Sequence, residues 1–174
     1  RHCDILRNNG YDSFLINKGN DLTSCKCNGN LFFVLSADTT YYGHIDKIVA
    51  TMWNTNSIID KLWNYKKRFY LVQGYETEFY TQEDSQLRQA ANATYSRDDI
   101  NYITISKWCE NWLRNDFKRN PIYIPNGIDI NQFHLVSRNY FGRIRILIEG
   151  DPESSWKNVD ESFRISNRLN KEKY

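Results

Sequence analysis

Long hydrophobic runs, histidine and an excess of charge of either sign are all scarce in this sequence. No apolar stretch approaches the roughly 20 residues that a helix needs to cross a bilayer, so we expect no membrane-spanning segment. The formal net charge is only +2 and no long basic run is present, which argues against a nucleic-acid-binding surface. The densest basic cluster is Lys66-Lys67-Arg68, which we interpret as the end of a helix-like stretch, where cations favour the helix dipole.

Cysteine and histidine are too few and too poorly spaced for a metal site. Cys25 and Cys27 lie closer together than zinc-binding pairs usually do, and Cys3 and Cys109 supply no second pair. With only three histidines, we predict no metal and interpret the cysteines as free thiols in a reducing cytoplasm. The stretch Asn92-Ala93-Thr94 matches a glycosylation sequon, which we interpret as a chance match.

Apolar runs alternate with amphipathic stretches, and this alternation predicts an α/β fold with a largely parallel sheet. The opening residues are typical of the second half of a helix that stops at Asn9-Gly10, so we expect a first strand to be missing in front. Residues 17–30 are rich in Gly, Asn, Asp and Ser, which indicates a loop. Strands are predicted at 13–16, 31–35, 47–53, 68–73, 101–105, 122–124 and 145–150.

Further helices are predicted between these strands. Thr55 and Ser106 are each expected to cap a helix, and another helix is expected over residues 83–95. A final helix is expected to carry Trp156, Val159, Phe163 and Leu169. The helix after Ser106 is expected to turn five side chains inward, namely Trp108, Cys109, Trp112, Leu113 and Phe117.

A rigid corner is predicted after the strand at 122–124. Pro125 fixes one backbone dihedral and Asn126-Gly127 favours positive φ, so the chain should turn sharply there. With Ile128-Asp129 and Phe133 following, the stretch resembles the Pro-Asn-Gly-Ile/Val-Asp…Phe signature of GT-B glycosyltransferases in the large retaining family 4. In that family the signature marks the passage from the acceptor domain into the donor domain. The resemblance therefore implies a hinge at Pro125, Asn126 and Gly127.

Other stretches agree with this resemblance in their order and spacing. Residues 2–16 are similar to the family's first helix and second strand, and residues 103–108 resemble the strand whose closing Ser begins a helix before the hinge. Residues 50–55 and 70–76 resemble its cleft-facing strand ends, particularly those of bacterial rhamnosyltransferase-like members. The resemblance thus covers almost the whole chain.

The resemblance also implies a domain plan. Residues 1–133 would form a Rossmann-like acceptor-side domain without its first strand, residues 134–143 a connector, and residues 144–174 the first βα unit of a donor-side domain. The paired glutamates with which the family engages the transferred sugar and the nucleotide ribose would lie beyond Tyr174. We therefore expect an incomplete, inactive piece of an enzyme, whose residues 144–174 self-associate or dock onto the main domain.

A candidate acceptor cleft follows from the predicted sheet. In open parallel sheets, ligands bind beyond the carboxyl ends of the strands. This rule selects six residues that close or follow the predicted strands at 47–53 and 68–73, namely Thr51, Trp53, Asn54, Gln73, Tyr75 and Glu76. The alternative interpretation is that these residues serve as caps and turn formers.

A candidate donor site follows the predicted strand at 145–150. A glycine, a polar loop and a helix N-terminus together favour anion binding, and Lys157 adds a charge suited to phosphate. In the family, a glycine here is followed by an Arg and a Lys that hold the donor diphosphate. Gly150 and Lys157 match this pattern, whereas Asp151 stands where the Arg is usual. A solvated Lys157 without a ligand is the alternative.

The resemblance implies transfer of a sugar from a nucleoside-diphosphate sugar to a saccharide or lipid-linked acceptor in bacterial surface-polysaccharide synthesis. It implies no cofactor besides the donor substrate, and a cytoplasmic location, either free or at the cytoplasmic face of the membrane. The family's cleft histidine has no counterpart, since Trp53-Asn54 and Gln73-Gly74 occupy the matching positions, so no catalytic residue is assigned. The alternative from another class is a non-catalytic α/β module that binds a glycan or a protein. A GT-B epimerase is disfavoured because its catalytic carboxylates and histidine are not evident.

Overall fold

A computed structural model describes residues 2–17, 34–36, 43–62, 64–137, 145–154 and 157–171 of the chain. The chain divides into two compact units, Arg1–Asn126 and Gly127–Tyr174. The division falls within the predicted hinge and before the connector predicted at 134–143.

The first unit is built on a parallel β-sheet. Its strand order is β3-β4-β5-β6, and every neighbouring pair is parallel. Each connection between neighbouring strands carries helix, as parallel pairing requires of a βαβ unit. The α/β, Rossmann-like architecture predicted from the sequence is therefore confirmed. The strands are β3 (Ile45–Ala50), β4 (Tyr65–Val72), β5 (Asn101–Thr104) and β6 (Ile122–Tyr123).

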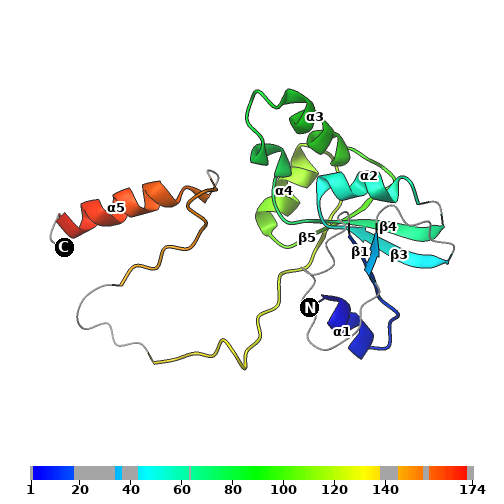
Figure 1. The fold of residues 1–174 in the computed structure, drawn as a ribbon, viewed down its shortest axis with the longest axis horizontal. Coiled ribbons are helices and arrows are strands. Elements are labelled where there is room, and N and C mark those ends of the chain that lie inside the picture. The colour runs from blue at the N-terminus through cyan, green and yellow to red at the C-terminus, as the bar shows by residue number, and fades with distance from the viewer. Residues whose placement is uncertain are drawn as a thin grey trace. The chain divides into compact units, whose positions relative to one another are not determined.

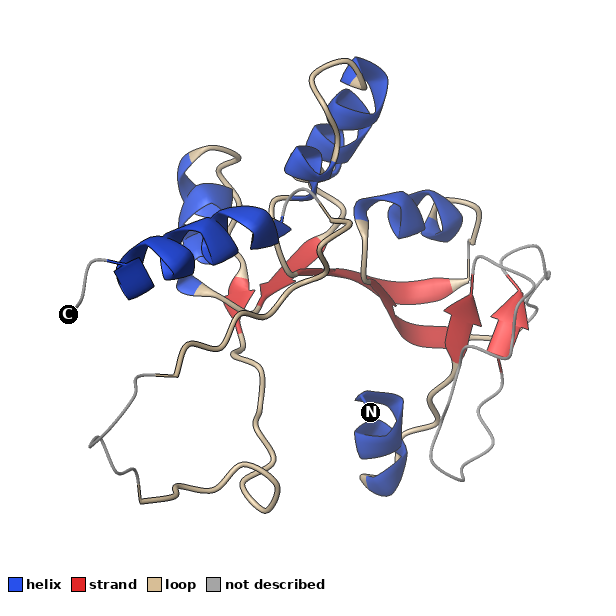
Figure 2. Ribbon diagram, turned by 60° about the vertical axis from the view of Figure 1, so that its left-hand side comes forward, coloured by secondary structure: helices blue, strands red, loops and turns tan. Residues whose placement is uncertain are grey.

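Helices flank this sheet on both sides. Helices α2, α3 and α4 lie over one face, and α1 lies on the other side (Figure 1; Figure 2). Helix α1 ends as predicted, because Gly10 follows it with a φ of +82°. The helical segments of this unit are α1 (His2–Asn8), η1 (Trp53–Thr55), α2 (Asn56–Ile59), η2 (Glu76–Phe79), α3 (Ser85–Thr94) and α4 (Lys107–Asn115), where η marks a 3₁₀ turn.

The two predicted helix caps have different outcomes. Ser106 caps α4 as predicted, since its hydroxyl oxygen accepts the N–H of Cys109 at 3.1 Å. Thr55 makes no capping hydrogen bond to α2. Its hydroxyl donates instead to the carbonyl of Met52 at 2.7 Å and accepts the N–H of Thr51 at 3.1 Å, so it tightens the turn after β3.

Two short strands precede this sheet along the chain. Strands β1 (Leu15–Asn17) and β2 (Val34–Ser36) pair in parallel as a separate two-stranded sheet. They overlap the strands predicted at 13–16 and 31–35. The loop predicted at 17–30, apart from Asn17, and residues 31–33 lie outside the described residues.

The core of the first unit combines aliphatic and aromatic side chains. Tyr70 and Tyr95 are both fully buried, and their rings stack with centroids 6.1 Å apart. Trp112 packs edge-on against Tyr95 at 4.9 Å, and Leu113 beside it is fully buried. Burying a side chain such as Leu113 contributes about 1.5–3 kcal/mol. These contacts join β4, the end of α3 and α4 into one core.

A buried guanidinium group forms the main polar contact of this unit. Only 1% of the Arg68 side chain is exposed, and its two terminal nitrogens donate to Asp60 at 2.6 Å, Asp99 at 3.2 Å and the carbonyl of Asn56 at 2.8 Å. Arg97 bonds to the same two carboxylates from the solvent side. Burial opposes ionisation of Asp60, but the hydrogen bonds from Arg97 and Arg68 outweigh it and lower its pKa. The network ties β4 to α2 and to the loop before β5.

The interpretation of Lys66-Lys67-Arg68 as the end of a helix is wrong. All three residues lie on β4, where the two lysines are exposed and Arg68 is buried. Lys66 pairs with Asp46 of β3 at 2.8 Å, with both side chains largely exposed. The cluster lies on a strand because Arg68, Tyr70 and Val72 are buried at alternate positions along one continuous segment.

The second unit has one helix among its described residues, α5 (Val159–Lys171). The strand predicted at 145–150 is not formed, and residues 145–149 are irregular. A strand needs a neighbour for its N–H and C=O groups, and no described residue pairs with this segment. Leu147 is accordingly 91% exposed.

Replacing Arg68 by methionine should lower the free energy of unfolding by about 2–3 kcal/mol, because Asn56 and the inner faces of two carboxylates lose their donors. Urea unfolding followed by circular dichroism measures the change. Lys66→Met is the matched control on the same strand, and we expect no measurable change from it because the Lys66–Asp46 pair is exposed. Equal losses in both variants would contradict the role assigned to Arg68.

Candidate functional site

The register of the parallel sheet brings the ends of its strands to one side. Ala50 is aligned with Tyr70, Val72 with Thr104, and Thr104 with Tyr123. Because all four strands run in the same direction, the loops that follow them leave from the same side of the sheet, which we call the carboxyl edge. Open parallel sheets bind their ligands at this edge.

The six residues predicted for the acceptor cleft all occupy the first two loops of the carboxyl edge. Thr51, Trp53 and Asn54 lie between β3 and α2, and the other three, Gln73, Tyr75 and Glu76, lie between β4 and α3. The structure therefore brings the two predicted groups to adjacent loops.

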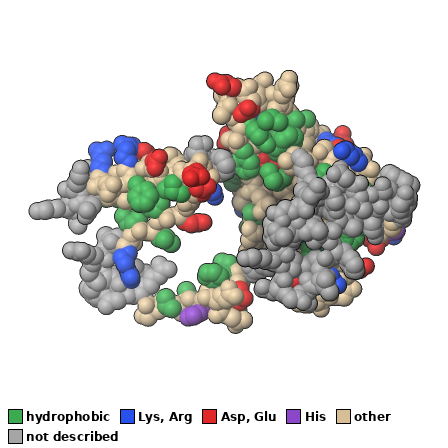
Figure 3. Space-filling view, viewed as in Figure 1, with side chains coloured by type: hydrophobic (Ala, Val, Ile, Leu, Met, Phe, Trp, Pro, Cys, Tyr) green, Lys and Arg blue, Asp and Glu red, His purple; other side chains and the backbone are tan. Residues whose placement is uncertain are grey.

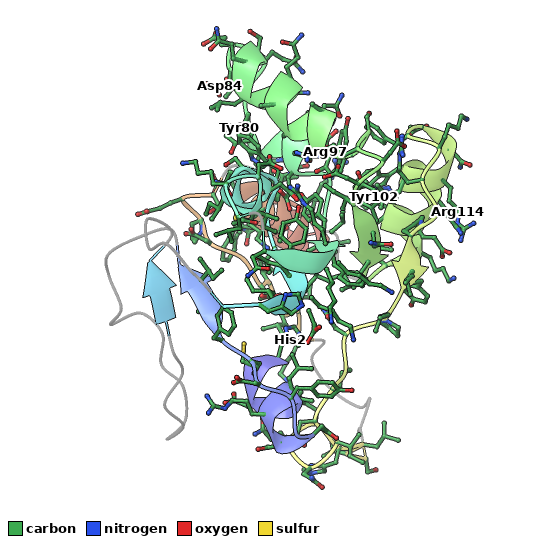
Figure 4. All side chains as sticks on the ribbon, turned by 90° about the vertical axis from the view of Figure 1, so that its right-hand side faces the viewer. His2, Tyr80, Asp84, Arg97, Tyr102 and Arg114 are labelled. Atoms are coloured by element: carbon green, nitrogen blue, oxygen red, sulfur yellow. The ribbon has the colours of Figure 1, made fainter. Side chains whose placement is uncertain are left out.

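Trp53 joins these two loops through both its backbone and its side chain. Its N–H donates to Oε2 of Glu76 at 2.6 Å, and its indole Nε1 donates to the hydroxyl of Tyr80 at 2.9 Å. The rings of Trp53 and Tyr80 meet edge to face, with centroids 5.9 Å apart. Figure 4 shows Tyr80 beside Asp84 at the beginning of α3. The loop after β3 is therefore held against the segment that leads into α3.

Glu76 is buried beneath this edge. Only 3% of Glu76 is exposed, and its backbone N–H donates to the hydroxyl of Tyr95 at 3.0 Å. Burial raises the pKa of the Glu76 carboxyl, while the N–H of Trp53 and the nearby Tyr70 hydroxyl act in the opposite direction. The Tyr70 hydroxyl does not reach hydrogen-bonding geometry with any described residue. Glu76 therefore positions the two loops and is not placed to touch a ligand.

Tyr75 is half-buried and also belongs to the supporting framework. Its hydroxyl donates to Oδ1 of Asn92 at 2.8 Å, and its ring packs against Trp112 with centroids 5.1 Å apart. Asn92 is the first residue of the sequon, and Thr94 of the same sequon is buried with its hydroxyl donating to the carbonyl of Ala91. Both sequon side chains are thus engaged within the fold.

Two of the six predicted residues, Thr51 and Gln73, are exposed. Asn54 is half-buried, as are Trp53 and Tyr75. The Thr51 N–H and the Asn54 carbonyl take part in turn hydrogen bonds, as the alternative interpretation predicts. The Gln73 amide makes no hydrogen bond with the part of the chain that the structure describes, so it is free to meet a ligand.

Trp108 is a carboxyl-edge residue that sequence reasoning missed. It was expected to face inward, and this expectation is wrong because 59% of it is exposed. Cys109 and Leu113 do lie at the centre of the buried face of α4, and Trp112 and Phe117 pack against the core as expected. The sequence did contain a signal for this exposure. Trp108 lies about 100° around the helix from Cys109, so it falls at the side of the buried face rather than at its centre.

The predicted corner at 125–127 has a different backbone from the one expected. Neither Asn126 nor Gly127 has a positive φ, so no Asn-Gly turn is formed. The turn comes later, where the Asp129 side chain accepts the N–H two residues on at 3.0 Å and the Asp129 carbonyl accepts the N–H of Phe133 at 2.8 Å. An aspartate side chain thus supplies the turn that the glycine was expected to make.

The two residues predicted to bind the donor diphosphate lie close together in the second unit. A Cβ added to Gly150 would lie 2.7 Å from Cγ2 of Val159 and 3.3 Å from Cβ of Lys157. Only glycine therefore lets this loop approach the beginning of α5. Lys157 is exposed and precedes the helix.

The Asp151 carboxylate accepts hydrogen bonds from groups of the same loop. Its carboxylate accepts the hydroxyl of Ser154 at 2.7 Å and the N–H of Glu153 at 3.1 Å, and these hydrogen bonds lower the pKa of Asp151. The loop therefore carries a fixed negative charge, and two groups that a phosphate would use are already taken. The departure from the family pattern at this position has a direct structural effect.

A cavity of about 170 Å³ opens at the opposite end of the sheet, where β5 and β6 begin. Both of its cations are engaged, since Lys118 donates to the carbonyl of Asn115 at 2.6 Å and Arg119 bonds to Asp98. Tyr102 also lines this cavity, and its hydroxyl accepts the backbone N–H of Arg97. Figure 4 shows these two residues beside each other. The cavity is lined by Ile100, Asn101, Tyr102, Lys118, Arg119, Asn120 and Ile122.

Within the described ranges, no three His, Cys, Asp or Glu side chains are grouped so that they could hold a metal ion. Helices of the length and apolarity that a membrane span requires are likewise not found there. His44 lies just before β3 beside Asp46, away from the carboxyl edge. Cys3 and Cys109 are free thiols, and Cys25 and Cys27 lie outside the described residues.

No protein-family model, curated protein or solved structure matches this chain. The fold defines an α/β protein with a Rossmann-like parallel sheet. Its two candidate binding regions are the carboxyl edge of the first unit and the loop after Gly150 in the second.

Replacing Glu76 by glutamine should change how stability depends on pH. Because burial raises the Glu76 pKa in the folded chain, folding takes up a proton between the unfolded and folded pKa values, and stability falls as pH rises through that window. Glu76→Gln keeps an acceptor for the Trp53 N–H and removes the charge. We expect the variant to gain stability relative to the unsubstituted chain as pH rises from about 4.3. Urea unfolding from acid to neutral pH measures it, and a pH-independent difference would contradict the prediction.

Proposed function

We propose that this chain forms the acceptor-side domain and the beginning of the donor-side domain of a GT-B glycosyltransferase. The enzyme would move a sugar from a nucleoside-diphosphate sugar to a saccharide or lipid-linked acceptor in bacterial surface-polysaccharide synthesis. The observation that carries the proposal is the position of the boundary between the two units. It falls between Asn126 and Gly127, inside the motif that marks the passage between domains in the family that the sequence resembles.

The construction of the carboxyl edge supports an acceptor-binding role. Trp53 and Glu76 hold the first two loops together, and Gln73 presents an unbonded amide beside them. Preorganised polar groups of this kind bind a substrate without reorganising first. A retaining transferase stabilises its leaving group electrostatically and does not rely on a strong base from this domain, so the proposal does not require Glu76 to be accessible.

The loop after Gly150 has two opposing charges in this proposal. Lys157 is exposed and attracts the donor diphosphate, whereas Asp151 repels it and competes for the Glu153 N–H and the Ser154 hydroxyl. Donor binding would therefore require the Asp151 side chain to turn away from the loop. The affinity of the loop for the diphosphate therefore depends on how far the attraction by Lys157 exceeds the repulsion by Asp151.

A non-catalytic α/β module that binds a glycan or a protein is the second candidate. The occupation of the loop by Asp151 favours it, since a module without a nucleotide needs no open anion site. The complete gene separates the two candidates. A transferase should continue beyond Tyr174 with further βα units that carry paired glutamates, and a binding module should not.

Substitutions of Lys157 and Asp151 should shift donor affinity in opposite directions in the complete gene product. Lys157→Ala removes a charged contact to phosphate and should weaken nucleoside-diphosphate binding about tenfold. Asp151→Asn removes the competing charge and should strengthen binding. Isothermal titration with UDP and dTDP measures both changes.

Arg145→Ala serves as the control for these titrations, because Arg145 is an exposed cation of the same unit outside the loop. Affinities that stay constant in both loop variants would remove the loop from the donor site. Sugar transfer by the 174-residue chain alone would contradict the placement of the donor site.

A further inference from the structure

An exposed indole stands at the carboxyl edge outside the contacts that hold the loops together. Trp108 lies in the first turn of α4, directly after β5, and is 59% exposed. Figure 3 shows hydrophobic side chains gathered at the surface of the first unit in the region of α3 and α4. Single exposed apolar residues are common and need no explanation, so the surroundings of Trp108 decide whether it forms a site.

The Trp108 ring packs against a cluster of aromatic rings, of which Tyr95 is fully buried and the others are half-buried. It meets Trp112 edge to face, with centroids 6.1 Å apart. Trp112 packs in turn against Tyr75 at 5.1 Å, Tyr95 at 4.9 Å and Phe117 at 5.8 Å. The indole therefore has a firm support on one side and solvent on the other, which lowers the entropy lost when a ligand lies on it.

A polar side chain without an internal partner lies on the neighbouring loop of the carboxyl edge. Val72 is paired with Thr104, so Gln73 leaves the sheet beside Ile105, three residues before Trp108. The Gln73 amide has no hydrogen bond to the described parts of the chain, and a Cβ added to Gly74 would meet no atom within 4 Å. The Gly74–Tyr75 loop is joined to Trp108 through Trp112. The Gln73 amide and the exposed indole thus lie on neighbouring loops of the carboxyl edge, after β4 and β5 respectively.

The charges beside the indole are already neutralised. Glu110 accepts from Lys107 at 2.7 Å and from Arg114 at 3.2 Å, and Lys107 also lies 4.2 Å from the centre of the Tyr123 ring. An uncharged aromatic surface with an amide on the neighbouring loop favours a neutral ligand that has both an apolar face and hydroxyl groups. A pyranose ring has this combination, because C–H groups cover one face and hydroxyls surround its rim.

We infer that Trp108 is a stacking platform for a neutral pyranose ring of the acceptor and that the Gln73 amide bonds to the hydroxyls of that ring. The electron-rich face of an indole attracts polarised hydrogens, and covering the C–H face removes apolar surface from water. The inference rests on the proposed function and specifies its acceptor as a neutral saccharide at this edge.

Saccharide binding by variants of the 174-residue chain tests the platform. The probes are trisaccharides of rhamnose, glucose, galactose and N-acetylglucosamine, followed by saturation-transfer NMR and calorimetric titration. We expect at least one to bind, Trp108→Ala to weaken it about tenfold, and Trp108→Phe to weaken it about threefold. Tyr11→Ala is the matched control, because Tyr11 is 58% exposed and lies in the loop before β1. It should leave binding unchanged.

Several outcomes would overturn the platform. They are saccharide binding that survives Trp108→Ala, an equal loss in Tyr11→Ala, and no binding by any probe. Self-association abolished by Trp108→Ala, without saccharide binding, would assign the surface to a second copy and also overturn it.

The platform and the proposed function fail in different ways. Nucleoside-diphosphate binding by the complete gene product without any saccharide binding would overturn the platform and leave the transferase proposal standing. Trp108-dependent saccharide binding by a gene product that binds no nucleoside diphosphate would support the platform and overturn the transferase proposal.

Discussion

The burial of one guanidinium group constrains the whole first unit. Removing an ion from water costs several kcal/mol unless acceptors surround it, so Arg68 can lie in the core only while Asp60, Asp99 and Asn56 face it. These acceptors come from α2 and from the loop before β5, on either side of β4 along the chain. The position of β4 is therefore coupled to α2 and to the loop before β5. The loop that leaves the carboxyl end of β4 consequently starts from a fixed point.

Some side chains at the carboxyl edge hold the loops in place, and others are exposed to solvent. Glu76 and Tyr75 were candidates for ligand contact, but Glu76 is buried and the half-buried Tyr75 bonds to Asn92, so both support the loops. Gln73 and Trp108 remain accessible, one after β4 and the other after β5. A site whose exposed groups are held by a buried framework loses less entropy when a ligand binds, and the proposed saccharide platform relies on this effect.

The loop after Gly150 shows how one residue changes the meaning of a pattern. The glycine is required by close approach to Val159, and Lys157 lies beside it as the resemblance implies. Asp151 nevertheless closes the loop on itself through Ser154, which a motif comparison alone does not reveal. The hydrogen bonds of Asp151 therefore determine which N–H and O–H groups of the loop stay unoccupied.

Local chemistry in the sequence was sufficient for the parallel α/β class, most strand positions and the Ser106 cap, because apolar runs and capping side chains act over a few residues. The partners of Arg68, the burial of Glu76 and the exposure of Trp108 were decided only by the tertiary structure. The same holds for the absence of a strand at 145–149. Burial, ion pairing and strand pairing depend on which distant segments become neighbours, and a linear pattern contains no record of those neighbours.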